Sequence, residues 1–171
     1  MDAAFFNKKS EALRRWVLNP WVWPFVLSKK LPMGAFAGLR VQKMDTESCT
    51  IILPFSRRTK NPFGSTYALA QGMAAEVSSG VPAFVLIAGA PVSVSMPITN
   101  ISGSFPKKAV DEIQFTFSDV FGMKKAVQKA AMGNEAVSFV ARSVGCTADG
   151  TVVSIWDTTW SFKRRSKKAA A

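Results

Sequence analysis

The most unusual chemical group in this sequence is a single carboxylate, Glu76. Between residues 61 and 106 it is the only acidic or basic side chain, and its neighbours along the chain are mainly Gly, Ala, Ser and Met. A carboxylate in such a segment lies either at a solvent-exposed edge or inside an enclosed site. Enclosure would raise its pKa, because burial disfavours the charged form, and would make it a useful general base. The sequence leaves both alternatives open.

Histidine is absent from all 171 residues, which excludes a Ser-His or Cys-His catalytic pair and a histidine metal site. The two cysteines, Cys49 and Cys146, form no C-x-x-C motif, so they build neither a zinc site nor a disulfide scaffold by themselves. We interpret them as reduced thiols and expect no metal ion and no cofactor. Any chemistry must come from carboxylates, hydroxyls, amides or backbone dipoles.

The pattern of apolar residues predicts the elements that position Glu76. Residues 64–87 predict a long helix with Ser65 as its N-cap, and its small residues are typical of a helix that neighbours approach closely. Few strands alternate with helices, which favours an α+β fold with one antiparallel sheet around one helix over a doubly wound parallel sheet. Strands are predicted at 38–45, 49–55, 91–105, 112–118, 136–147 and 151–163, and further helices at 3–18, 21–30 and 121–132.

The chain is strongly basic, with a net charge of +11, and its 48% of hydrophobic residues suffices for a sizeable core. Solvated surface explains this charge, as would anionic lipid headgroups, a phosphorylated ligand or nucleic acid. No nucleic-acid-binding motif is present, so nucleic acid is not the expected partner. The basic residues gather in three sets: Lys8, Lys9, Arg14, Arg15, Lys29 and Lys30; Arg57, Arg58 and Lys60; and Lys163, Arg164, Arg165, Lys167 and Lys168.

An apolar segment at residues 16–27 is too short to span a membrane, and two prolines interrupt it. Its basic flanks and three tryptophans would suit peripheral contact with a membrane interface. The alternative that we favour is a pair of helical pieces that cover Trp16, Trp21 and Trp23 at least partly against the domain. The N-terminus lacks the basic-then-apolar order of a signal peptide, which predicts a cytoplasmic location.

The segment from Asn61 to Glu76 resembles the loop and central helix of hot-dog-fold acyl-CoA thioesterases. In one branch of that superfamily, an Asn precedes a His-Gly-Gly turn by six positions, and an Asp or Glu follows the His by nine. Here Asn61 lies six positions before Tyr67, and Glu76 lies nine after it. Residues 89–99 are similar to that branch's third strand, with Ser93 at the position of a serine that helps to place the attacking water.

The closing hairpin, with Asp149-Gly150 and Thr159-Trp160, is similar to that of a thioesterase-like branch of unknown function. The resemblance implies a hot-dog domain over residues 35–163, preceded by a helical extension (1–34) and followed by a basic tail (164–171) without fixed structure. It also implies a homodimer or a dimer of dimers, because the resembling proteins pair through their sheets.

The resemblance further implies hydrolysis of acyl thioesters, with coenzyme A present only as part of the substrate. Glu76 would activate water or attack directly, and the backbone N–H of Ala68, at a helix N-terminus, would polarise the thioester carbonyl. Three further groups of residues are implied: Asn61 and Ser93 to hold the carbonyl and the water; Tyr67, Leu69, Gln71 and Gly72 to contact the substrate; and Arg57, Arg58 and Lys60 to bind the phosphates of coenzyme A.

One departure from the pattern keeps a second function open. Tyr67, Ala68 and Leu69 replace the His-Gly-Gly turn, so side chains stand where the acyl group would approach. The alternative is a non-catalytic hot-dog module that binds acyl groups or lipids, or that only dimerises. In that case Asn61 would form an Asn-Pro turn and Ser93 would be an ordinary strand residue.

Overall fold

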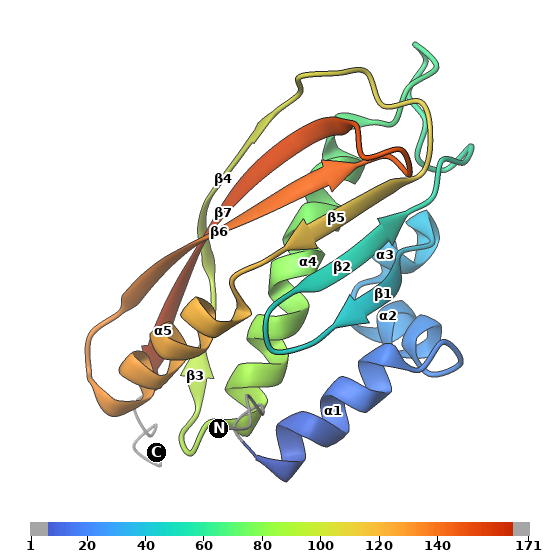
Figure 1. The fold of residues 1–171 in the computed structure, drawn as a ribbon. Coiled ribbons are helices and arrows are strands. Elements are labelled where there is room, and N and C mark those ends of the chain that lie inside the picture. Colours follow the sequence, from blue (N-terminus) through green and yellow to red (C-terminus); the bar gives the residue numbers. More distant parts are fainter. Residues whose placement is uncertain (1–6, 166–171) are drawn as a thin grey trace, which may run out of the picture.

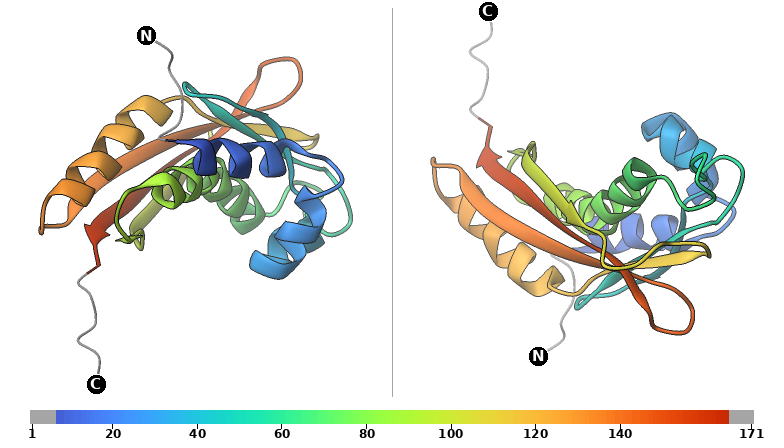
Figure 2. Two further views of the ribbon diagram at one scale, coloured as in Figure 1. Left: turned by 90° about the horizontal axis from the view of Figure 1, so that it is seen from below. Right: turned by 90° about the horizontal axis from the view of Figure 1, so that it is seen from above.

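A curved antiparallel sheet wraps around one long helix, α4 (Figures 1 and 2). The computed structural model describes residues 7–165. The strands follow the order β1-β2-β5-β6-β7, and β3 and β4 both pair with the far side of β7. The elements are α1 (Lys8–Leu18), α2 (Trp23–Lys30), α3 (Pro32–Ala37), β1 (Arg40–Met44), β2 (Cys49–Leu53), α4 (Ala68–Gly89), β3 (Val94–Ser95), β4 (Ile98–Ser104), β5 (Ile113–Phe117), α5 (Val120–Met132), β6 (Val137–Cys146) and β7 (Val152–Arg164).

The predicted antiparallel sheet around a long helix is confirmed, and three local expectations are corrected. Helix α4 begins at Ala68 rather than at residue 64, because the side chain of Ser65 accepts a hydrogen bond from the Asn61 amide at 2.9 Å and caps no helix. The expected strand at 91–105 is divided into β3 and β4, with Pro97 between them. Helix α3 was not expected; two helices fill the region where the sequence predicted one.

The small residues of α4 are explained by two tryptophans of β7. The ring of Trp156 lies so close to Gly72 that a Cβ there would be 2.8 Å from the ring. Trp160 contacts α4 about two helical turns farther along and donates a hydrogen bond from Nε1 to Ser79 Oγ at 3.0 Å. Side chains larger than these would hold the sheet away from the helix, so the composition of α4 follows from this close approach.

The N-terminal helices pack on the same core as the sheet, through Val17, Trp23 and Leu27. Trp23 is buried and donates from its indole N–H to the Leu39 carbonyl oxygen at 3.0 Å. Trp21, however, is 90% exposed, so the expectation that all three tryptophans are covered is wrong for this residue. The tight turn after α1, where the Asn19 side chain accepts from the Trp21 N–H, turns the indole outward.

The predicted boundary between extension and domain, at residues 34 and 35, falls inside α3. Of the predicted basic tail, only residues 164 and 165 belong to the described part of the chain, and Arg164 still pairs with β3. Residues 166–171 lie outside the described residues.

Helix α4 is, by length and composition, apolar enough to cross a membrane. However, 61% of its most apolar window is buried inside the fold, as expected for the core helix of a folded domain. Both cysteines are free, and burial raises the pKa of the Cys49 thiol, which disfavours thiolate chemistry there.

Candidate functional site

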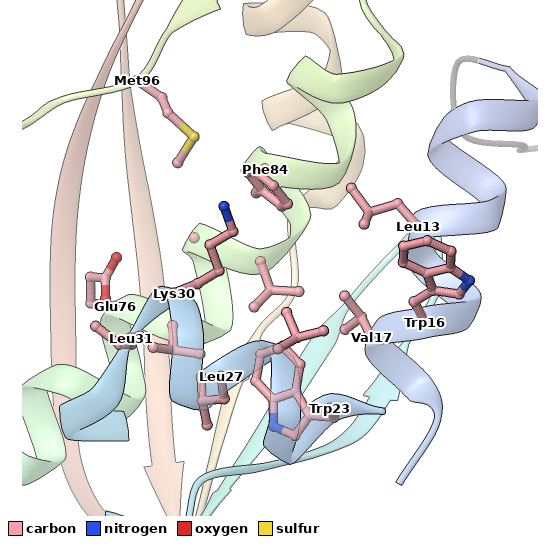
Figure 3. A pocket seen from close by; sticks show the side chains of 14 residues that line it. Leu13, Trp16, Val17, Trp23, Leu27, Lys30, Leu31, Glu76, Phe84 and Met96 are labelled. Atoms are coloured by element: carbon pink, nitrogen blue, oxygen red, sulfur yellow. The ribbon is translucent and has the colours of Figure 1, made fainter. Parts of the chain in front are cut away.

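Glu76 lies in the middle of α4 and lines an apolar cavity (Figure 3). Its carboxylate forms no hydrogen bond or ion pair with any side chain or backbone group of residues 7–165. Burial raises the pKa of this carboxyl from 4.5 to about 7, because the charged form loses hydration and gains no compensating partner. Of the two alternatives for Glu76, an enclosed site and a solvent-exposed edge, the structure therefore supports the enclosed site.

The cavity has a volume of about 380 Å³ and lies between the N-terminal helices and α4. Besides Glu76, Lys30 is the one ionisable side chain on its wall, and the two form no ion pair. In Figure 3 the Lys30 side chain extends from α2 across the cavity toward Phe84 and Met96. The other lining residues are almost all apolar: Leu13, Trp16, Val17, Trp23, Val26, Leu27, Leu31, Val77, Gly80, Val81, Phe84 and Met96.

The N-terminus of α4 lies away from this cavity. Tyr67 is the N-cap residue but provides no side-chain cap, and the N–H groups of Ala68 and Leu69 have no acceptor within the described chain. Tyr67 and Leu69 are 49% and 65% exposed, so the first turn faces solvent. Eight residues separate Ala68 from Glu76, which corresponds to about 12 Å along the helix axis. Within one chain the predicted oxyanion donor and the predicted base are therefore apart.

Asn61 and Ser93 do not line the cavity with Glu76. The Asn61 side chain holds its own loop, accepting from the N–H groups of Phe63 and Ser65. Ser93 is exposed, and its carbonyl oxygen accepts from the Arg165 N–H at 2.9 Å. These contacts agree with the alternative in which Asn61 forms a turn and Ser93 has no special role. Catalytic roles for the two residues stay predictions.

Gln71 and Gly72 point into the protein rather than toward solvent. Gln71 is 4% exposed; its amide donates to the Thr66 carbonyl oxygen at 3.2 Å, while Oε1 has no hydrogen-bond partner. Gly72 lies under the Trp156 ring. Packing accounts for both positions, and their contact with a substrate stays a prediction.

The three basic residues proposed for phosphate binding lie in the loop between β2 and α4. Arg57, Arg58 and Lys60 are exposed, as a phosphate-binding role requires. Arg58 donates to the Phe36 carbonyl oxygen at 3.1 Å, and Lys60 Nζ lies 4.0 Å from the centre of the Phe55 ring. None of the three lines the cavity, so a phosphate role for them stays a prediction.

The sequence interpretation missed the contribution of α1 and α2 to the site. Leu13 and Val17 recur at helical spacing, as do Trp23 and Leu27, which marks an apolar face on each helix. This spacing indicates that the two faces are buried, but it does not indicate which element they pack against. Only the packing of both helices beside α4 turns these faces into the wall of a cavity around Glu76.

No protein-family model matches the sequence, and no curated protein matches it by sequence. Solved structures do match its fold. A protein of unknown function from Chlorobaculum tepidum has a TM-score of 0.71 at 10% identity, covering 91% of this chain and 94% of its own. A Pseudomonas aeruginosa protein of unknown function, described as a "Probable Thioesterase", has a TM-score of 0.67 at 16% identity, covering 86% and 97%.

A thioesterase from Haemophilus influenzae is similar as well, with a TM-score of 0.64 at 10% identity over 85% of this chain and 91% of its own. At such low identities the likeness concerns the backbone: the curved sheet, the long helix and their connections. The sheet and the long helix were predicted from the order of the elements and the hot-dog fold from the resemblance, and the structural likeness confirms both. The chain adopts the hot-dog fold shared by these thioesterase-like proteins.

Proposed function

We propose that this protein hydrolyses acyl thioesters, with Glu76 as the general base. The observation that carries the proposal is the unpaired Glu76 carboxylate, whose pKa is raised to about 7 at the wall of an apolar cavity. A carboxylate with a pKa near neutrality accepts a proton from water more readily than an ordinary one. Glu76 takes a proton from water as the oxygen attacks the thioester carbonyl carbon; the carbon–sulfur bond then breaks, and the thiolate receives that proton.

The cavity supports an acyl group as the part of the substrate that this protein buries. Its volume of about 380 Å³ lies at the lower end of the range for small-molecule pockets, and its wall is almost entirely apolar. The polar coenzyme A portion remains outside, where exposed Arg57, Arg58 and Lys60 offer positive charge to its phosphates.

A homodimer would complete the site. The reacting carbonyl must lie within about 3 Å of both the base and the oxyanion donor, whereas Glu76 and Ala68 of one chain are about 12 Å apart along α4. Strand β4 pairs with β7 on one side only among residues 7–165, and all seven of its residues are exposed. Pairing of two β4 edges would protect them and bring Ala68 of one protomer toward Glu76 of the other. Sedimentation of a clean 18.6 kDa monomer would contradict this arrangement.

The test is release of free thiol from acyl-coenzyme A substrates of several chain lengths. We expect turnover to rise with pH through about 7, as Glu76 loses its proton. The Glu76→Gln variant should lower kcat by roughly 10²-fold, the scale of a lost general base. Glu135→Gln, which changes an exposed glutamate after α5, is the matched control and should retain full activity. A Glu76→Gln variant as active as its parent would overturn the assignment.

A second function, acyl binding without turnover, is favoured by one observation. Leu69 and Tyr67 stand at the N-terminus of α4, where the resembling enzymes carry glycine and histidine. In that case an acyl-coenzyme A or a fatty acid would bind in the cavity and raise the melting temperature, while no thiol is released at any chain length.

A further inference from the structure

The N-terminal helices expose a row of large apolar side chains on the side that faces away from the core. We call this surface the aromatic face. Its members lie in the turn before α2, in α2 and in α3. They are Trp21 (90% exposed), Phe25 (62%), Met33 (67%) and Phe36 (58%).

Helix α2 is apolar on two opposite sides, which sets it apart from an ordinary surface helix. Trp23 and Leu27, one turn apart, are buried and line the cavity, and Phe25 lies on the other side of the same helix. A helix that only covers a core would carry polar residues on its outer side. Several large apolar side chains exposed within one short segment mark a candidate site of interaction.

The segment that carries the aromatic face has charged residues of one sign only. Residues 12–44 contain no Asp or Glu. Lys29 at the end of α2 and Arg58 beside α3 form no ion pair with any residue between 7 and 165. Lys29 Nζ lies 4.4 Å from the centre of the Phe25 ring, so the cation and the aromatic ring are presented together.

We propose that the aromatic face docks this protein on anionic lipid membranes. Tryptophan and phenylalanine enter the boundary between headgroups and acyl chains, and neighbouring lysines and arginines bind the anionic headgroups. A second copy of the chain suits the surface less well, because a symmetric contact would bring Lys29 and Arg58 of both protomers together. The proposal goes beyond thioester hydrolysis and stands without it.

Docking in this orientation has a geometric consequence for the cavity. Helix α2 would lie at the membrane with Phe25 in the lipid, while its opposite side, with Trp23 and Leu27, forms the wall of the cavity around Glu76. One helix thus separates the bilayer from the apolar space inside the protein.

The test is binding of the full chain to vesicles of phosphatidylcholine alone or with about one third phosphatidylserine, measured by co-sedimentation. We expect binding to the anionic vesicles only, and its release by high salt. Trp21 also serves as a probe: the tryptophan fluorescence of the parent should shift to shorter wavelength and be quenched by brominated lipid, and both changes should be smaller in the variant that lacks Trp21. The double variants Trp21→Ser/Phe25→Ser and Lys29→Glu/Arg58→Glu should each lower the partition coefficient by about tenfold or more.

Helix α5 supplies a matched control. Phe121 is 57% exposed, and Lys125 Nζ lies 4.4 Å from its ring centre, as Lys29 does from Phe25. The Phe121→Ser/Lys125→Glu variant should bind vesicles like the parent, and unchanged melting temperatures verify folding of all variants. Absence of binding, equal binding to neutral vesicles, or equal loss in the α5 variant would each overturn the proposal. So would a dimer that dissociates in the Trp21→Ser/Phe25→Ser variant while no vesicle binding occurs; that result assigns the face to a second copy.

Discussion

The two sides of α4 differ in how completely they are packed. Toward the sheet, Gly72 meets the Trp156 ring, Ser79 accepts from the Trp160 indole, and the hydroxyls of Ser78 and Ser143 are 2.8 Å apart. Toward the N-terminal helices, the same helix borders a cavity of about 380 Å³, and the carboxylate of Glu76 has no partner. We call these the sheet side and the cavity side.

The two sides of α4 therefore contribute differently to the free energy of folding. On the sheet side, close contact and the paired groups named above each lower the free energy of the folded state, while Trp156 Nε1 and Ser154 Oγ of β7 are buried without a partner among the described residues. On the cavity side, an empty apolar volume and an unpaired buried carboxylate both raise it. A folded protein keeps such features mainly where a ligand or a reaction uses them.

The largest effect is expected on the sheet side, from Trp160→Ala. Trp160 is 3% exposed and bonded to Ser79, so its removal leaves both a large void and a hydroxyl without its donor. We expect a loss of about 4 kcal/mol in the free energy of unfolding, measured by denaturant titration. Trp160→Phe keeps most of the ring and should cost markedly less. Equal losses in the two variants would show that ring packing contributes little here.

An intermediate effect of opposite sign is expected on the cavity side, from Glu76→Gln. The pKa of about 7 in the folded protein exceeds the ordinary value of 4.5, so the contribution of Glu76 to stability is complete below pH 4.5 and is lost as the pH rises through 7. The variant carries no charge, so its free energy of unfolding should exceed that of the parent by about 3 kcal/mol well above pH 7. At pH 4 the two proteins should unfold alike. A constant difference between pH 4 and 8 would contradict the raised pKa.

The smallest effect is expected from glycine-to-alanine changes in α4, and the direction of the change in melting temperature should differ between the sheet side and the cavity side. Alanine is favoured over glycine within a helix by about 1 kcal/mol. At Gly72 a Cβ would lie 2.8 Å from the rigid Trp156 ring, so Gly72→Ala should lower the melting temperature. At Gly80 the nearest atom, at 2.9 Å, is the Glu76 carboxylate, which has the cavity to move into. Gly80→Ala should therefore leave the melting temperature unchanged or raise it. Destabilisation of equal size at both glycines would show that the cavity side is as tightly packed as the sheet side.

Much of the fold follows from local sequence signals. Apolar periodicity predicts α5 and every strand except the one expected at 91–105 to within about two residues, and the Asp149-Gly150 turn is confirmed by the positive φ of Gly150 (84°). The N-cap at Ser65 was predicted wrongly, because local rules could not show that Asn61 occupies the side chain and backbone of Ser65. The geometry of the loop, which local rules do not describe, decides that Ser65 pairs with Asn61 and does not cap the helix.

The candidate site was predictable only in part. Glu76 stands out in the sequence because no other charge lies between residues 61 and 106, and within α4 this follows from the burial of the helix. The cavity was not predictable, because its walls come from α1, α2 and α4, which are distant in sequence. The exposure of Trp21 was not predictable either, since an apolar segment indicates burial by default.

Strand β7 has a consequence for the order in which the protein is made. It is synthesised after every other described element, yet it pairs with β3, β4 and β6 and supplies both tryptophans that cover α4. While the ribosome translates the residues between α4 and β7, the 22-residue apolar helix has already been made and lacks this cover. During this interval the nascent chain offers an apolar surface to chaperones and to other nascent chains. Slow translation of residues 90–160 should therefore increase aggregation more than slow translation of the N-terminal helices.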